Sequence, residues 1–348
     1  MPQISSPAVS AYYSAIYGAL APSVASQTTL TILSLLLSLI AFAVIMTMLF
    51  TIFSLMFAWA ERKLVARAQS RRGPTYVGKY GLLQNLADLF KLMSKESITP
   101  ASADKPLFKT VLPALMALSM AVLAFIPMNG AFVGMDTTLG MLAIFVMLSF
   151  SPMLLFIAGW SSGNKYAAVA AHRSIVMLAS YEIPMVLVVV AVAALANSYG
   201  MSAIVGMQQH MWFAFLMPIG FIVFFVVLLA ELGRPPFDLD KADSELIGGR
   251  LTDAPAPYYG LALLLDYTRL FVGALLVSEL FLGGWNSISI IPQFLVLIVK
   301  VVLVALLVVL IRAATVRMKV DRALRLGWLY LMPLAVANLL ITFVLFVR

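Results

Sequence analysis

Five carboxylates fall within one short stretch of the sequence, with two basic side chains between them. The acids are Glu231, Asp238, Asp240, Asp243 and Glu245, and the bases are Arg234 and Lys241. Carboxylates this close cannot all ionise at their reference pKa values, so the group should titrate as a coupled unit. Such a unit takes up and releases protons when a nearby charge changes, which indicates proton-relay chemistry. The alternative is a solvated acidic loop that binds basic partner proteins.

Further charged residues lie inside long apolar stretches. Glu182 stands midway along residues 168–196 and has no cation within four residues, while Asp266 and Arg269 share the stretch 259–282. Ionisable groups inside a membrane are costly and usually face the protein interior or water. A desolvated carboxylate at position 182 suits a group that exchanges protons. Asp266 and Arg269 are three residues apart, so the spacing predicts an ion pair between them.

The other dense charged segment follows the first apolar stretch. Its charged residues include Glu61, Arg62, Lys63, Arg67 and Arg72. Glycine and proline interrupt the chain after them. An amphipathic pattern then begins at about residue 82, which predicts a helix lying in the membrane interface. The alternative function of this segment is a basic loop that sets topology and attracts anionic lipid.

The elements that must hold these residues are helices. Of the residues, 63% are hydrophobic and 11% charged, far from the soluble average of roughly 45–50% and 25%. Eight apolar stretches each reach the roughly 17–25 residues that span a bilayer as a helix: 29–58, 110–127, 138–160, 168–196, 212–230, 259–282, 290–311 and 328–347. Short alternating strands of the β-barrel kind are absent from the sequence. The sequence predicts an all-α, polytopic membrane protein with about eight transmembrane helices and one interfacial amphipathic helix.

The basic residues predict the orientation. Twenty of the 23 Lys and Arg fall in alternate loops or at their edges. By the positive-inside rule these loops are cytoplasmic, and both termini lie on the outer side of the inner (cytoplasmic) membrane. The net charge of +8 is thereby explained without nucleic acid. We expect one integral membrane domain over 1–348, with an outer segment at 1–28, a first cytoplasmic loop at 61–109 and an acidic cytoplasmic loop at 231–258.

The sequence restricts the redox chemistry that this chain can hold. Cysteine is absent, which excludes a cysteine-ligated iron–sulfur cluster and a Cys/His zinc site. The two histidines, His172 and His210, are predicted at opposite membrane faces, so they cannot both ligate one haem. Any electrons must therefore travel through partner subunits. A free-standing secondary transporter is disfavoured because the chain shows no convincing internal repeat.

Several motifs, in order along the chain, resemble one family. Glu61-Arg62-Lys63-Leu64 leads into Gly81-Leu82-Leu83-Gln84, and later come Gly159-Trp160-Ser161-Ser162, Ser180-Tyr181-Glu182, and Glu231 followed by Arg234-Pro235-Pro236-Phe237-Asp238-Leu239. Ser244-Glu245-Leu246 and Gly283-Gly284-Trp285 complete the set. Together they resemble the H-type membrane proteins of respiratory complex I (NADH:quinone oxidoreductase), a family with F420H2 dehydrogenase and membrane-bound hydrogenase relatives.

The chain departs from this family's pattern at a few positions. Lys79 stands where a proline is usual, Lys241 replaces a usual glutamate, and Asp266-Tyr267 replaces a usual Glu-Tyr. These differences are compatible with a divergent branch that uses a carrier other than ubiquinone.

The resemblance implies a role for each charged segment. It places Glu61, Arg62, Lys63, Arg67, Arg72 and Arg234 near a chamber for a quinone-like lipid-soluble carrier, between the first long helix, the interfacial helix and the helix of Asp266. It assigns Glu182, Glu231, Asp238, Asp240, Asp243, Glu245 and Asp266 to a proton-coupling path. No metal, iron–sulfur cluster, haem or covalently held cofactor is expected in this chain.

The resemblance also implies partners and an activity. The expected partners are peripheral iron–sulfur and quinone-site subunits, antiporter-like and small membrane subunits, and membrane lipid. The expected function is that of a non-redox subunit of an NADH, F420H2 or ferredoxin:quinone-type oxidoreductase, inactive alone, that couples carrier reduction to ion pumping. The alternative is the equivalent subunit of an energy-converting hydrogenase or formate hydrogenlyase, which has no quinone. Glu279 and Lys300 match no motif and receive no role.

Overall fold

The computed structural model describes residues 7–20, 27–129, 134–241, 243–286 and 292–346, and these ranges contain helices and loops but no strand. The longer helices are α1 (Pro7–Leu20), α2 (Gln27–Ala68), α3 (Gln84–Ser94), α4 (Lys105–Phe125), α5 (Gly140–Trp160), α6 (Lys165–Ala196), α9 (Pro218–Glu231), α11 (Ala256–Phe281), α12 (Gln293–Ala314) and α14 (Met332–Phe346). Shorter ones are η1 (Lys79–Gly81), α7 (Met201–Met207), α8 (Phe213–Leu216), α10 (Asp243–Leu246), η2 (Gly249–Leu251), α13 (Val320–Arg325) and the π-helical η3 (Leu326–Leu331).

The all-α, multi-pass membrane architecture is confirmed. Within the described ranges, seven helices are long and apolar enough to cross a membrane, the last of them running from α13 through α14. The remaining predicted span, 212–230, is divided into α8 and α9. Pro218 starts α9, and a proline disfavours helical backbone in the residue before it. The 14 residues of α9 rise only about 21 Å, less than the roughly 30 Å of hydrocarbon.

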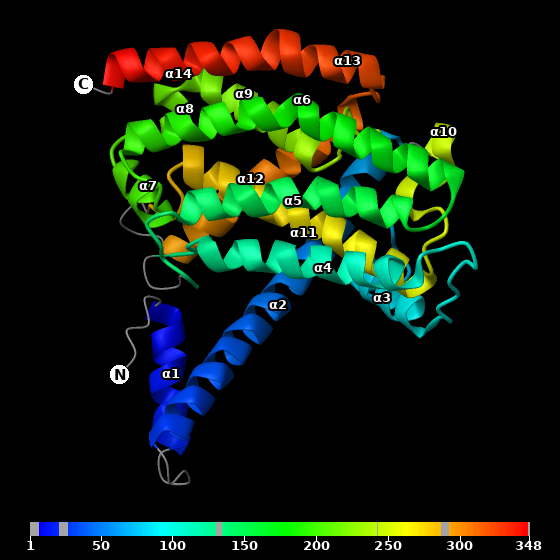
Figure 1. The fold of residues 1–348 in the computed structure, drawn as a ribbon, viewed down its shortest axis with the longest axis horizontal. Helices are drawn as coiled ribbons and strands as arrows, with labels where there is room; N and C mark the ends of the chain where they lie inside the picture. The colour runs from blue at the N-terminus through cyan, green and yellow to red at the C-terminus, as the bar shows by residue number, and fades with distance from the viewer. Residues whose placement is uncertain (1–6, 21–26, 130–133, 242, 287–291, 347–348) are drawn as a thin grey trace.

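The first long helix extends beyond its apolar stretch. α2 continues through Ala68, so Glu61, Arg62, Lys63 and Arg67 lie on the helix itself rather than in a loop beginning at residue 61. In Figure 1, α2 crosses the molecule obliquely, and its N-terminal half extends away from the other helices beside α1. The interfacial helix is confirmed as an element, α3, at 84–94.

The centre of the bundle is α11. It packs against α2, α3, α4, α7, α9 and α12, and every residue from Leu270 to Phe281 is buried. Helices α4, α5 and α6 run side by side along one face, and α14 packs along α6 (Figure 1). This arrangement places Asp266, Arg269 and Glu279, all on α11, in the interior of the protein.

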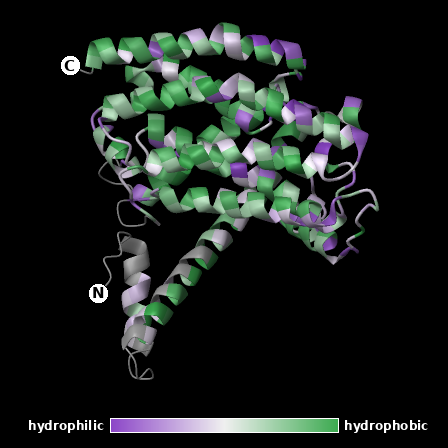
Figure 2. Ribbon diagram, in the orientation of Figure 1, coloured by the Kyte–Doolittle hydropathy of each residue, from purple (hydrophilic) through white to green (hydrophobic). Residues whose placement is uncertain are grey.

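Polar residues gather at one end of the bundle. Figure 2 shows the hydrophilic segments around α3, α10 and the start of α13, whereas the helix midsections are apolar. α7 and α8 lie at the opposite end (Figure 1). The basic loops that the sequence assigns to one membrane side therefore lie together in space. Which side is cytoplasmic stays a prediction.

Candidate functional site

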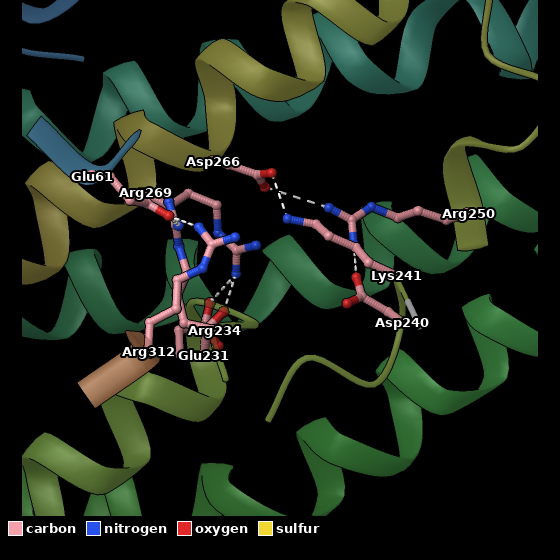
Figure 3. Close-up of polar contacts among 9 residues, drawn as sticks. All are labelled: Glu61, Glu231, Arg234, Asp240, Lys241, Arg250, Asp266, Arg269 and Arg312. Carbon is pink, nitrogen blue, oxygen red and sulfur yellow. Dashed lines mark hydrogen bonds and ion pairs between the residues drawn. The ribbon is translucent and has the colours of Figure 1, made fainter. Parts of the chain in front are cut away.

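Ten ionisable side chains, most of them buried, form a charge cluster at the polar end of the bundle. It comprises the acids Glu61, Glu231, Asp238, Asp240 and Asp266, and the bases Arg234, Lys241, Arg250, Arg269 and Arg312. They come from α2, the end of α9, the α9–α11 connection, α11 and α12. Figure 3 shows nine of them, whose ion pairs form three neighbouring groups. Acids and bases are equal in number, which is how a protein interior tolerates so many charges.

Glu61 lies between two arginines. Its carboxylate is 2% exposed and accepts hydrogen bonds from Arg234 Nη1 at 2.6 and 2.8 Å. Arg312, from the end of α12, pairs with the same carboxylate. The Arg234 guanidinium also lies 5.1 Å from the ring centroid of Tyr267, and its Nε and Nη2 have no hydrogen-bond partner among the described residues. Glu61 thus joins three segments that are remote in sequence.

Glu231, the last residue of α9, is held by two other helices. Tyr181 on α6 donates its hydroxyl hydrogen to Glu231 Oε2 at 2.6 Å, and Arg269 Nη2 donates to Oε1 at 2.9 Å and to the backbone carbonyl of Glu231. The predicted Asp266–Arg269 pair is therefore wrong. The buried Glu231 carboxylate would be strongly destabilising without a cation, and Arg269 is the cation that pairs with it.

Asp266 takes its partners from the connection after α9. Lys241 Nζ lies 2.5 Å from Asp266 Oδ2, and Arg250 Nη2 lies 3.5 Å from Oδ1. Arg250 also pairs with Asp240, so this ion pair lies within the α9–α11 connection. Lys241 and Asp266 are both positions at which the sequence departs from the family pattern, and they contact one another.

Asp238 is the acid of the cluster with an unused oxygen. Its Oδ1 is buried and has no hydrogen-bond partner in the described part of the chain. Burial raises the pKa of Asp238 above its ordinary value, although the charges of Lys241 and Arg250 act in the other direction. Asp238 is therefore suited to hold a proton within an otherwise paired cluster.

Three of the predicted acids stand apart from this cluster. Glu245 is half-exposed and binds Arg173 and Arg317, each at 2.6 Å, and these two hydrogen-bonded cations lower its pKa. Glu182 is half-buried beside Tyr181 and makes no hydrogen bond or ion pair with another described residue. Asp243 begins α10, but its side chain lies outside the described part. The structure thus brings together Glu231, Asp238, Asp240 and Asp266 only.

A small cavity lies where the resemblance places the carrier chamber, between α2, α3 and α11. Its lining includes Ser54, Arg62, Asp88, Gly260, Leu264 and Tyr267. Its volume is about 60 Å³, which has room for water molecules. Tyr267 lines this cavity and also contacts Arg234, which connects the cavity to the charge cluster.

Polar contacts fix α3 against α2 at this cavity. Arg62 Nη1 donates to Asp88 Oδ2 at 2.8 Å, and Asn85 Nδ2 donates to the backbone carbonyl of Leu55 at 2.9 Å. Burial opposes ionisation of Asp88, but the Arg62 and Gln84 hydrogen bonds leave its pKa below the ordinary value. These contacts hold the interfacial helix in place.

The remaining predicted chamber residues lie further along α2 and beyond it. Lys63 packs against the Gly73 turn, and Arg67 and Arg72 are exposed. Exposed cations at the polar end of the bundle suit a protein interface better than a chamber wall.

Sequence reasoning missed two members of the cluster and one residue that binds it. Arg250 and Arg312 read as loop cations that set topology, and Tyr181 read only as part of a motif. Their partners, Asp240, Glu61 and Glu231, are fixed by tertiary packing. Only contact information from related sequences could have found them.

The histidines and acids of the described residues are not grouped as metal ligands are. No group of three or more His, Cys, Asp or Glu side chains that could hold a metal occurs in the described ranges. His172 Nδ1 lies 2.7 Å from the carbonyl oxygen of Ala168, and the ring packs edge-on against Phe156, as a structural histidine does.

Comparison with known proteins gives consistent matches along most of the chain. The sequence model of the NADH dehydrogenase family matches residues 40–343. A protein of Carboxydothermus hydrogenoformans is 37% identical over 294 residues, which cover 83% of each chain, and one of Dehalococcoides mccartyi strain CBDB1 is 39% identical over 84% of this chain and 83% of its own. A Bacillus thuringiensis protein is 37% identical over 81% of this chain and 86% of its own. Each of the three carries the name of the H-type subunit of NADH-quinone oxidoreductase.

Proposed function

The chain belongs to the NADH dehydrogenase family, and we propose that it forms the chamber for a quinone-like carrier and couples reduction of that carrier to ion pumping. The chain is a multi-pass membrane subunit of a complex I-like oxidoreductase. The observation that carries the proposal is the contact of Arg234 with both Tyr267, which lines the cavity, and Glu61, which anchors the charge cluster.

The cavity supports a carrier site by its composition and position. Leucines from α2, α3 and α11 line part of its wall, and Arg62, Asn85, Asp88 and Tyr267 supply polar groups. Pockets for small molecules are mostly apolar with a small number of polar groups that fix orientation. The carrier would enter from lipid with its apolar tail along α3.

The charge cluster supports coupling because its members share partners. Arg234 and Arg312 share Glu61, and Lys241 and Arg250 share Asp266. Reduction of a quinone-like carrier consumes two protons with two electrons. A change of charge on a carrier beside Tyr267 would alter the field at Arg234, and the contact of Arg234 with Glu61 must then rearrange.

Within the cluster, two groups have the features of proton carriers. Asp238 Oδ1 has no hydrogen-bond partner among the described residues, and Glu231 accepts a hydrogen bond from the Tyr181 hydroxyl, next to the half-buried Glu182. We assign the proton path to Asp238, Glu231 and Glu182, with Asp240, Asp243 and Asp266 setting the charge of the connection. Glu245, bound by two arginines at the surface, holds the loops together instead.

The electrons must come from partner subunits, because this chain has no cysteine to hold an iron–sulfur cluster. The exposed Arg67 and Arg72 are suited to bind a peripheral subunit that carries the last cluster. Antiporter-like and small membrane subunits would receive the proton signal along the bundle. This arrangement predicts a complex in the inner membrane, with both termini outside and no activity of the chain alone.

A direct assay tests the proposal. The complex containing this chain is purified and given its electron donor, and reduction of a short-tailed quinone analogue and evolution of hydrogen are measured side by side. We expect quinone reduction without hydrogen evolution. Hydrogen evolution without quinone reduction would instead assign the chain to an energy-converting hydrogenase.

A further inference from the structure

The far end of α11 contains a second ionisable site. Glu279 lies thirteen residues after Asp266, about 20 Å along the helix, at the end of the bundle that holds α7 and α8. The side chain is 0% exposed, and neither carboxyl oxygen has a hydrogen-bond partner among the described residues. The charge cluster does not include it.

The polar groups around Glu279 are already engaged. Gln208 Nε2 donates to the backbone carbonyl of Glu279 at 2.7 Å, and Gln208 Oε1 accepts from the backbone N–H of Gly283 at 2.9 Å. Asn286 Nδ2 donates to the carbonyl of Val205 at 2.6 Å. These amides therefore fix the turn after α11 and leave the Glu279 carboxyl unsolvated.

An unpaired carboxylate costs far more to bury than the neutral acid does. Glu279 therefore holds a proton on its carboxyl group in this conformation. An uncharged acid at a fully buried position would usually find an acceptor for its hydrogen, and the surrounding amides do not supply one. The group is neither a paired structural carboxylate nor a satisfied neutral acid.

A cation lies on the other side of the same turn. Lys300 on α12 is partly exposed, and its Nζ donates to the carbonyls of Leu282 and Gly284, each at 2.7 Å. A Cβ built on Gly284 would lie 3.5 Å from Glu279 Cγ, so this residue lies beside the acid, while its carbonyl binds the Lys300 ammonium. Gly283 and Gly284 both have positive φ, at 73° and 47°, which few other residues adopt.

We propose that Glu279 is a proton-binding site that exchanges its proton with the aqueous phase at this end of the bundle, with Lys300 as its counter-cation. In the conformation seen here the proton is bound to the carboxyl and Lys300 binds the turn. When the Gly283–Gly284 turn moves, the proton leaves to water and the carboxylate accepts a hydrogen bond from the Lys300 ammonium. Release of the proton takes the pair from a net charge of +1 to zero, and the lost charge leaves with the proton.

Few other groups can affect this titration. Lys300 is the charged side chain whose described contacts converge on the turn, while Gln208 and Asn286 are neutral. Trp212 covers the Lys300 ammonium, with its ring centroid at 5.1 Å. His210 follows α7 but is exposed. Arg269, on the same helix, is bound to Glu231.

Infrared difference spectra of the purified complex, taken between acidic and alkaline pH, test the proposal. We expect a carbonyl band of a protonated carboxylic acid that shifts in D2O, disappears as the pH rises, and is absent from Glu279→Gln. The matched control is Glu96→Gln, which removes an exposed glutamate and should leave that band in place. Lys300→Met removes the counter-cation, so its band should persist to higher pH.

Two results would overturn the proposal. One is a carboxylic acid band, identified in absolute spectra by its loss in Glu279→Gln, that stays constant over the whole accessible pH range, as a structural acid requires. The other is the absence of any band that the Glu279→Gln change removes. If Glu279→Gln fails to assemble, the complex is labelled with 13C-glutamate and the wild type is compared with Lys300→Met. A glutamic acid band that persists to higher pH in Lys300→Met supports the proposal, and a band with the same pH dependence in both contradicts it. Carrier reduction does not enter this measurement, so its outcome is independent of the proposed function.

Discussion

The Arg269 guanidinium donates hydrogen bonds to both the side chain and the backbone carbonyl of Glu231, 38 residues earlier in the chain. This contact closes α9 against α11 at the point where α9 ends. Because Arg269 is bound to Glu231, Asp266 pairs instead with Lys241 and Arg250 from the α9–α11 connection. The positions of the loop cations and of α9 therefore depend on one another.

The two arginines on Glu61 predict unequal effects of substitution. Arg312→Met leaves the buried Glu61–Arg234 pair intact, whereas Glu61→Leu leaves two cations without their carboxylate. Removing one partner from a buried pair costs about 3–5 kcal/mol. We expect Glu61→Leu to lower the melting temperature of the purified complex, or prevent assembly, and Arg312→Met to have a much smaller effect.

The control for this pair is Lys109→Met, which removes an exposed cation from α4. It should leave the melting temperature unchanged. Equal destabilisation by Glu61→Leu and Arg312→Met would contradict the shared-carboxylate arrangement.

Lys241 and Asp266 should be energetically coupled. A double-mutant cycle with Lys241→Met and Asp266→Asn isolates their interaction, because Asp240 still pairs with Arg250 in every variant. Contacting pairs give coupling energies of about 0.5–3 kcal/mol. Chemical denaturation of the purified complex measures it, and strictly additive effects would show that the 2.5 Å contact contributes nothing.

The cavity between α3 and α11 predicts a steric block. A Cβ on Gly260 would lie 3.3 Å from Leu92 Cβ, so Gly260→Val pushes against α3 where the carrier enters. We expect the KM for a long-tailed quinone analogue to rise about ten-fold or more, since valine adds an isopropyl group and even one methylene in a pocket is worth about ten-fold. The control, Gly206→Ala, adds a methyl group that meets no atom within 4 Å. An unchanged KM in Gly260→Val would place the carrier elsewhere.

Asp238 predicts a pH dependence of stability. Its pKa is raised in the folded protein by burial, so the folded state binds more protons than the unfolded state from about pH 4 upward. Stability is therefore lost as the pH rises through the folded pKa. Asp238→Asn should remove this loss, measured as melting temperature against pH, whereas the exposed Asp136→Asn should keep it. A wild-type profile that rises through this interval and is unaffected by Asp238→Asn would contradict the assignment.

The distribution of apolar and basic residues predicted the architecture well, because transmembrane length and loop charge are local properties. It failed at 212–230, where Pro218 divides one stretch into α8 and the short α9. The sequence pattern also ended the first long helix at about residue 60, whereas α2 continues to Ala68. Glu61 lies within this helix, where Arg234 and Arg312 from two other segments pair with it.

The site was only partly predictable for a similar reason. Glu231, Asp240 and Asp266 could be identified by type and position, and they do lie together. Which cation each one binds depends on the helix packing, so Arg269 could not be assigned to Glu231 from a spacing that favoured Asp266. Glu279 had no motif, and only its burial identifies it.

Glu231 gives the most direct test of the coupling proposal. The complex is placed in liposomes, and quinone-analogue reduction and proton translocation are recorded together for the wild type, Glu231→Gln and the exposed control Glu96→Gln. Gln keeps the shape of the side chain but cannot carry a charge or exchange a proton. We predict that assembled Glu231→Gln loses both activities by about ten-fold or more, as removal of a proton-transfer group does, while Glu96→Gln matches the wild type. Unchanged reduction and translocation in Glu231→Gln would contradict the role of the charge cluster in coupling.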